Sequence, residues 1–351
     1  MRLISLFVLL VLLSSCKKDD PTVEDGNIII SNGMMVLCEG LFQQNNSTLS
    51  WVNNPNGNVI NDYYLQTSGL QLGDTGNDMK IYGGKIYIAM NGSSTIEVLS
   101  ALTGVSITQI PMFDGPIAKE PRSIAFYDGK AYVTCYDGYV DVIDTSSLEI
   151  EQRIQVGTNP EGITVANGKL FVANSGGLNF PNVDSTVSVI NPITSMEIMK
   201  ITVGLNPGSI ITDVQGDVYV ITRGDYASIP SRMHRINSAS NVVLDDFDFD
   251  ASSMSLMNSN LLVGYSDFVG GTNSIGLFNT ISETMSASDF VDLSNVQTVY
   301  GIEYNSSNDR IYIMDAMDFT TTGYVRTFSS AGLPLSDFHV GLNPSEIIFF
   351  D

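Results

Sequence analysis

Short stretches of alternating apolar and polar residues follow one another along most of the chain, separated by turns rich in Gly, Asn and Asp. Four such stretches form one unit, at residues 162–166, 169–173, 186–190 and 199–203. Their two-residue period and β-branched residues predict strands, and Asn167-Gly168 between the first two predicts a tight hairpin turn. Because no stretch has the period of a helix, the pattern predicts an all-β chain.

The unit recurs along the sequence. The phrase Val-Gly-x-Asn-Pro occurs at residues 156–160, 203–207 and 340–344, and the glycines of its first two copies are 47 positions apart (204 − 157). A fixed period of about 40 to 50 residues is typical of propellers and solenoids. Four short antiparallel strands in each unit correspond to one propeller blade.

Six units can be aligned on their second strands, at residues 84–88, 129–133, 168–172, 216–220, 260–263 and 309–313. A seventh is split, because residues 33–37 form a second strand with no first strand before it and residues 345–350 form a first strand with nothing after it. Pairing the two chain ends would complete the ring and remove open sheet edges. We therefore predict a seven-bladed β-propeller over residues 28–351, with four antiparallel strands per blade.

The N-terminal segment has the features of an export signal. Leu3–Leu13 is apolar but too short to span a bilayer, so we predict a signal peptide at residues 1–15. Leu13-Ser14-Ser15-Cys16 resembles the lipobox of bacterial lipoproteins, in which the Cys is diacylated and becomes the first mature residue. Residues 16–27 are then a lipidated Cys16 and a flexible linker. Lys17–Asp20 resembles the export tag of Bacteroidota surface lipoproteins, which implies an outer-membrane protein facing the cell exterior.

The formal charge of −22 becomes −23 once Arg2 is removed with the signal peptide. A surface this acidic disfavours nucleic acid and anionic lipid headgroups as partners. We therefore expect contact with the membrane only through the acyl chains. Cys38 and Cys135 lie on second strands of non-adjacent blades, too far apart for a disulfide, and we expect buried free thiols.

Loops that join second to third strands, and those that lead into the next blade, lie on one face of a propeller. Here they combine aromatic residues with Gly, Asn and Asp, which supply contact area and adaptable hydrogen bonds. Each ring could instead cover the top of its own blade, but five loops of this composition favour a binding surface. The predicted ligand-binding residues are Asn77, Asp78, Arg122, Tyr136, Tyr139, Asn174, Phe180, Arg223, Tyr226, Tyr265, Phe268, Asp315 and Phe319.

No catalytic constellation stands out. His234 and His339 fall on predicted third and fourth strands outside any ligand-spaced cluster, and there is no nucleophile elbow or phosphate-binding glycine motif. Counting residues does not exclude a catalytic triad. The acidic run 245–250 lacks the calcium-loop pattern and alternates Asp with Phe, as an outer strand would. We therefore expect a protein that is not an enzyme and that holds no metal or cofactor. The alternatives to a ligand-binding protein are a protein-interaction or adhesion propeller and a hydrolase or lyase that acts on glycans or lactones.

The blade pattern is similar to that of the YncE-like seven-bladed propellers. Residues 72–87, following Leu37-Cys38-Glu39-Gly40, resemble the surface lipoprotein propellers that capture cobalamin for a TonB-dependent outer-membrane transporter. The resemblance covers most of residues 28–351 as a fold and is residue-specific mainly over residues 33–150. It implies a small-molecule ligand, cobalamin or another corrinoid, held in the propeller mouth and passed to a TonB-dependent transporter.

Overall fold

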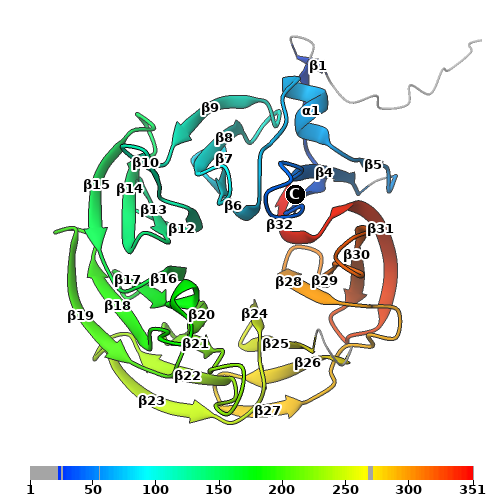
Figure 1. Cartoon of the computed structure of the whole chain (residues 1–351). Coiled ribbons are helices and arrows are strands. Elements are labelled where there is room, and N and C mark those ends of the chain that lie inside the picture. Colours follow the sequence, from blue (N-terminus) through cyan, green and yellow to red (C-terminus); the bar gives the residue numbers. More distant parts are fainter. Residues whose placement is uncertain (1–22, 25–26, 55, 268–271, 351) are drawn as a thin grey trace, which may run out of the picture.

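Seven four-stranded antiparallel sheets form a ring around a central axis (Figure 1). The computed structural model describes residues 23–24, 27–54, 56–267 and 272–350. Each sheet is one blade, and its first strand lies innermost, because the first strands of neighbouring blades contact one another around the whole ring. The predicted seven-bladed β-propeller is confirmed.

The blades follow chain order. Blade 1 consists of β6 (Gly76–Tyr82), β7 (Lys85–Met90), β8 (Thr95–Ser100) and β9 (Ser106–Pro111). Blade 2 consists of β12 (Pro121–Tyr127), β13 (Lys130–Cys135), β14 (Tyr139–Asp144) and β15 (Ile150–Gln155). Blade 3 consists of β16 (Pro160–Ala166), β17 (Lys169–Asn174), β18 (Thr186–Asn191) and β19 (Met196–Thr202). Blade 4 consists of β20 (Pro207–Thr212), β21 (Val218–Thr222), β22 (Arg232–Asn237) and β23 (Val242–Phe247). Blade 5 consists of β24 (Ser253–Met257), β25 (Asn260–Asp267), β26 (Thr272–Asn279) and β27 (Thr284–Ala287). Blade 6 consists of β28 (Val299–Asn305), β29 (Arg310–Asp315), β30 (Thr322–Ser329) and β31 (Pro334–Leu342).

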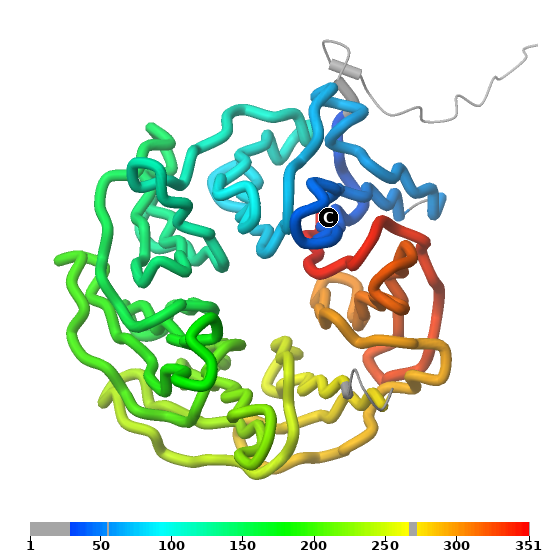
Figure 2. Tube along the Cα trace, viewed as in Figure 1, coloured from blue at the N-terminus to red at the C-terminus, as the bar shows by residue number. Residues whose placement is uncertain are grey.

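The seventh blade joins the two ends of the chain. It has the order β32 (Pro344–Phe350), β3 (Gly33–Cys38), β4 (Thr48–Asn53) and β5 (Val59–Ile60). The register runs from Gly33 opposite Phe350 to Cys38 opposite Pro344. Figure 2 shows the red C-terminal strand beside the blue N-terminal segment, as the sequence predicted.

The apolar core lies between adjacent blades rather than at the centre of the ring. One cluster, for example, joins Tyr312 and Val325 of blade 6 to Val36 and Ile347 of blade 7. The second strands are covered on both faces by neighbouring blades and consist almost entirely of buried residues, whereas the outer fourth strands contain many exposed ones. Packing between blades therefore makes ring closure a condition for a complete core.

A few elements differ from the sequence-based expectation. A six-residue helix, α1 (Tyr63–Ser68), follows the short fourth strand of blade 7 and buries Tyr63 and Tyr64. It was missed because one and a half turns are too short to establish a helical period. The other additions are a 3-10 turn (Gly177–Asn179) and two short hairpins, β1 (Val23–Glu24) with β2 (Asn27–Ile28) and β10 (Phe113–Asp114) with β11 (Ile117–Ala118).

Several strand assignments are confirmed with shifted ends. The fourth strand of blade 3 begins at Met196 rather than residue 199, and the acidic outer strand of blade 4 ends at Phe247 rather than residue 250. Cys38 and Cys135 are buried free thiols, as expected. The signal peptide and Cys16 lie outside the described residues.

No helix in the described ranges is long and apolar enough to cross a membrane.

Candidate functional site

The loops that the sequence singled out meet on one face of the ring, here called the mouth face. In blades 2, 3, 4 and 7 the residue after the second strand donates its backbone N–H to the carbonyl just before the first strand of the same blade. The pairs are Tyr136 to Glu120 (3.2 Å), Ser175 to Asn159 (3.1 Å), Arg223 to Asn206 (3.0 Å) and Glu39 to Asn343 (2.8 Å). These hydrogen bonds bring the loops after second strands and the blade-entry turns together. The hairpins between first and second strands lie on the opposite face.

The repeated Val-Gly-x-Asn-Pro phrase builds the blade-entry turn. Asn159, Asn206 and Asn343 all have left-handed backbones, with φ of 44°, 58° and 54°, a conformation that Asn tolerates better than most residues. Glycine two positions earlier is required by close packing: a Cβ on Gly157 would lie 2.3 Å from Cγ of Asn174. The sequence repeat is therefore a structural device that sets how each first strand enters the ring.

A β-bulge follows this turn at the start of most first strands. The register shifts between Gly76 and Asp78, Pro121 and Ile124, Pro160 and Ile163, Pro207 and Ile210, and Val299 and Gly301. Bulges re-aim side chains and are common beside functional sites. Here the second residue of each bulged strand lines a cavity of about 300 Å³ at the mouth of the central channel; these residues are Asn77, Arg122, Glu161, Gly208 and Tyr300.

Glu161 is the hub of the mouth cavity. Its Oε2 accepts a hydrogen bond from Arg122 Nε at 2.9 Å, and its Oε1 accepts one from Tyr136 Oη at 2.6 Å and lies 3.4 Å from Arg223 Nη1. Arg122 also donates to Asn77 Oδ1, and its guanidinium lies 4.6 Å from the centre of the Tyr136 ring. Burial opposes ionisation, but the guanidiniums of Arg122 and Arg223 outweigh it and lower the pKa of Glu161 to about 2. The hub is therefore an ionised, fixed cluster.

A second cluster stands across the mouth. Tyr300 donates a hydrogen bond from its hydroxyl to Glu39, and its ring meets Phe319 edge-on at 5.6 Å between centroids. Burial raises the pKa of the Glu39 carboxyl, while the Tyr300 hydrogen bond and the charge of Arg122 limit the rise. Burial and the neighbouring Glu39 charge raise the pKa of the Tyr300 hydroxyl in turn. Tyr300 therefore remains a hydrogen-bond donor throughout the physiological range.

Further down the channel a lysine is surrounded by acids. Lys80 Nζ lies 2.8 Å from Asp78 Oδ1 and 3.2 Å from Glu346 Oε2, and its side chain keeps 42% of its surface exposed. Burial raises the pKa of Glu303 and of Glu346, and the charge of Asp78 adds to the rise, while Lys80 opposes it. This cluster forms a polar floor beneath the mouth.

The predicted site residues separate into groups. Asn77, Arg122 and Arg223 line the mouth cavity, and Tyr136 and Phe319 contact its Glu161 and Tyr300. Phe180 and Tyr226 project from the surrounding rim and are 58% and 70% exposed. Tyr139 lines a neighbouring cavity of about 500 Å³ together with Tyr136, and the Arg153 guanidinium lies 4.1 Å from the centre of its ring.

Three predicted residues instead support the framework. Asn174 is fully buried and its amide bonds to Gly157 N, Thr186 and Ser188. Asp315 is fully buried and accepts from Thr298 N and Arg326 Nε. Asp78 accepts from Ile124 N at 2.7 Å, which ties blade 1 to blade 2. These residues lie at the ends of second strands or the starts of first strands, as predicted, but their side chains form hydrogen bonds to the surrounding framework.

Of the last two predicted residues, one does not line the mouth cavity and the other is outside the described chain. Tyr265 is half-buried within β25 and does not line the mouth cavity. Phe268 lies outside the described residues.

The ligand-binding residues predicted from the sequence do not include Glu161, Tyr300, Glu303, Glu346 or Glu39, which all line the mouth cavity. The signal for the first two was present in the repeat: the residue after the blade-entry Pro, or its equivalent, is the channel-facing one. Glu161 follows Pro160, and Arg122 follows Pro121. The bulge that turns these side chains into the channel is a three-dimensional feature that strand alternation does not reveal.

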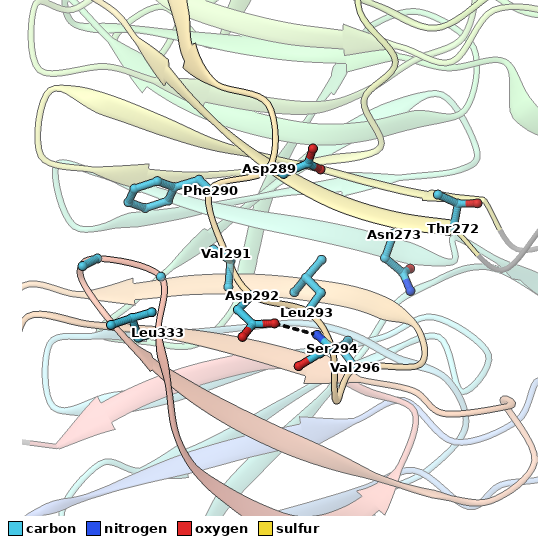
Figure 3. A pocket seen from close by; sticks show the side chains of 12 residues that line it. Thr272, Asn273, Asp289, Phe290, Val291, Asp292, Leu293, Ser294, Val296 and Leu333 are labelled. Carbon is cyan, nitrogen blue, oxygen red and sulfur yellow. Dashed lines mark hydrogen bonds between the residues drawn. The ribbon is translucent and has the colours of Figure 1, made fainter.

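A larger cavity lies away from the mouth, between blades 5 and 6 (Figure 3). It measures about 660 Å³ and lies between the segment that links blade 5 to blade 6 and the turn around Gly332. Asp292 Oδ1 accepts a hydrogen bond from Ser294 N at 3.1 Å, which stabilises that linking segment. None of the predicted site residues lines this cavity.

Within the part of the chain that the structure describes, no three or more His, Cys, Asp or Glu side chains are arranged to hold a metal ion.

The architecture is that of a seven-bladed β-propeller, a fold consistent with ligand or protein binding. Residues 32–326 match the model of the family described as Domain of unknown function (DUF5074), and the chain belongs to that family. No curated protein is significantly similar to the chain in sequence.

Solved structures share the fold at low sequence identity. A functionally unknown protein from Desulfotomaculum acetoxidans has a TM-score of 0.64 at 13% identity, over 91% of this chain and 98% of its own. A quinonprotein alcohol dehydrogenase-like protein from Bacteroides thetaiotaomicron has a TM-score of 0.63 at 14% identity, over 92% and 79%. Hydrazine synthase from Kuenenia stuttgartiensis has a TM-score of 0.63 at 16% identity, over 77% and 88%. At such low sequence identity, these similarities show a shared architecture and nothing about function.

Proposed function

We propose that the protein is a surface lipoprotein, not an enzyme, that binds a soluble ligand over the mouth of the propeller and delivers it to a TonB-dependent outer-membrane transporter. Cobalamin or another corrinoid is the proposed ligand, on the resemblance of residues 37–40 and 72–87 to the cobalamin-capturing propellers. The observation that carries the proposal is the Glu161 hub, where Arg122, Tyr136 and Arg223, from two non-adjacent blades, converge on one carboxylate.

The hub supports binding because it is preorganised. Its side chains are held by hydrogen bonds and ion pairs, so little conformational entropy remains to be lost when a ligand arrives. The channel as a whole carries five carboxylates (Glu39, Asp78, Glu161, Glu303 and Glu346) against three cations (Lys80, Arg122 and Arg223), a formal charge of −2. A neutral ligand rich in amide or hydroxyl groups suits this mixture of donors and acceptors better than a polyanion does.

Size sets the binding mode. Drug-sized ligands occupy pockets of about 300–1,000 Å³, and a corrinoid with its amide side chains is larger than such ligands. The mouth cavity, at about 300 Å³, would admit only one substituent. The corrinoid would therefore lie across the mouth and contact the exposed rim, including Phe180 and Tyr226.

The position of the N-terminal segment supports an accessible mouth. Ile30 N donates to the carbonyl of Leu102, in the turn between the third and fourth strands of blade 1. That turn lies on the face opposite the mouth. A lipid tether on Cys16 would thus hold the ring from behind and leave the mouth open to the medium, so a transporter would cover the mouth after capture.

Titration of cyanocobalamin into the mature protein tests the ligand. We expect saturable heat and a change in the corrin absorption spectrum with one equivalent bound. Absence of both at micromolar protein would exclude cobalamin as the ligand.

A protein-docking role is the second candidate, and the rim is the observation that favours it. Phe42, Leu178 and Leu70 are 65%, 65% and 61% exposed, in connections of blades 7 and 3 and in the link from blade 7 to blade 1. Exposed apolar side chains spaced around the ring could each anchor a partner that covers it. A Phe42→Ser and Leu178→Ser double variant that binds cobalamin normally but no longer copurifies with the transporter would assign the rim to the protein partner. A variant that loses both would assign it to the ligand.

A further inference from the structure

Arg122 and Arg223 stand on either side of Glu161 but differ in how fully they are bound. Arg122 donates from Nε and Nη2 to Glu161 Oε2, both at 2.9 Å, and from Nη1 to Asn77. The Arg223 side chain makes one hydrogen bond or ion pair within the described chain, from Nη1 to Glu161 Oε1 at 3.4 Å. A guanidinium has five N–H donors, so Arg223 keeps most of its donors available while Arg122 is used to build the hub.

Arg223 is also placed by the fold to reach the channel. Its backbone N–H is fixed to Asn206 O, and its guanidinium lies over Gly208, the residue that occupies the channel-facing position of blade 4. A Cβ at Gly208 would lie 2.6 Å from Cζ of Arg223. The absence of a side chain at residue 208 therefore gives the guanidinium its place, where 33% of the side chain remains exposed.

The wall of the cavity next to Arg223 consists of small residues. Ser209, Ser252 and Ser253 line it beside Gly208. The Oγ of Ser253 is itself buried over Gly264 of β25 and is not exposed to the cavity. This side of the mouth thus combines small residues with a cation that has unused donors, whereas the Glu39 and Tyr300 side is closed by its own hydrogen bond.

We propose that Arg223 is the ligand-contacting cation of the mouth and that the subsite it forms above Gly208 takes a planar acyl group, a carboxamide or a carboxylate. The fork of N–H donors on a guanidinium matches an acyl oxygen or a pair of carboxylate oxygens. Because Glu161 already balances part of the charge of Arg223, a neutral amide is accepted without an unpaired ion. The inference deepens the proposed function, and its first test is independent of cobalamin.

The first test uses small probes. The chain has seven arginines besides Arg2, so the ¹⁵N-labelled protein gives a sparse set of Nε–Hε signals, and loss of a signal in Arg223→Lys identifies Arg223. Titration with acetamide and with sodium acetate, at constant ionic strength, is expected to shift the Arg223 signal saturably while exposed Arg310, on the opposite face, stays unchanged. A response to acetamide assigns a neutral amide group, and a response to acetate alone assigns a carboxylate. If neither probe moves the Arg223 signal more than the Arg310 signal, the inference is wrong.

The second test uses the whole ligand. If cyanocobalamin binds, Arg223→Gln should raise its Kd about tenfold or more, as expected of a central contact, while the matched Arg310→Gln leaves it unchanged. Binding that Arg223→Gln does not weaken would refute the inference and leave the proposed function intact. Saturable shifts of Arg223 with the small probes, in a protein that does not bind cobalamin, would refute the proposed ligand and leave the inference intact.

Discussion

Ending the chain after Asn343 removes β32 and should unfold the protein rather than trim its end. The deletion takes away Ile347 and Ile348, which are 5% and 8% exposed. Loss of a buried Ile side chain costs about 2–5 kcal/mol. It also removes six register pairs with β3, for which about 1 kcal/mol per hydrogen bond is a reasonable scale. The sum, roughly 10 kcal/mol, is comparable with the whole stability of a typical folded protein, about 5–15 kcal/mol.

Differential scanning calorimetry of the full-length and truncated mature proteins measures this effect. We expect the truncated protein to show no cooperative transition, or one displaced by tens of degrees. A graded control is Ile347→Ala, which at about 3 kcal/mol and an unfolding entropy of about 0.7 kcal/mol/K for roughly 320 residues should lower Tm by about 4 °C. Ile193→Ala, at an 82% exposed position, should change Tm by less than about 1 °C. A truncated protein that melts cooperatively within a few degrees of the full chain would show that the ring does not depend on this closure.

Three further predictions concern the mouth. The pKa of Glu161 falls from 4.5 to about 2 on folding, so its ionisation contributes about 3 kcal/mol to the free energy of unfolding, which is present above pH 4.5 and lost as pH falls towards 2. Urea melts should therefore show that Glu161→Gln is less stable than the natural protein at pH 7 and that its stability depends less on acid pH. Equal acid sensitivity of the two proteins would contradict the assignment. If cobalamin binds, Tyr226→Ala should weaken binding by about 2 kcal/mol. The change in Tm should be small, because the ring is 70% exposed and its hydroxyl accepts one hydrogen bond, from Asn206. Unchanged affinity would exclude Tyr226 from the contact surface. Gly157→Ala should lower the free energy of unfolding by about 1–3 kcal/mol through overpacking. Gly177→Ala should lower it by less than about 1 kcal/mol, because a Cβ at residue 177 would lie 3.4 Å from its nearest neighbour. Equal melting curves for the two variants would mean that the blade-entry turn tolerates a side chain at residue 157.

The architecture was readable because its signals are local and repeated. Alternation along residues 169–173, the Asn167-Gly168 hairpin and the recurrent entry phrase each specify a short piece of backbone, and the repeat multiplies them. Even the split blade followed, since Gly33–Leu37 lacked a first strand and residues 345–350 lacked a second. Helix α1 escaped notice because its stability comes from burying Tyr63 and Tyr64 rather than from a period in the sequence.

The mouth was only partly predictable, for a physical reason. Loop residues such as Tyr226 and Phe180 could be assigned to the correct face because connection order fixes the face. The side chains that meet in the channel come from bulged strand entries, and their direction depends on backbone register rather than on residue type. Asn174 and Asp315 illustrate the opposite case, because polar residues at strand ends resemble ligand-binding groups in the sequence, whereas in the structure their side chains accept hydrogen bonds from neighbouring backbone N–H groups.

Hydrogen–deuterium exchange of the mature protein, with and without cyanocobalamin, tests most directly whether recognition takes place at the mouth. The account predicts added protection in segments 120–123, 136–139, 159–162 and 223–226, and none in the outer segment 289–296. Protection confined to segment 289–296, or absent from the whole chain at saturating cobalamin, would contradict it.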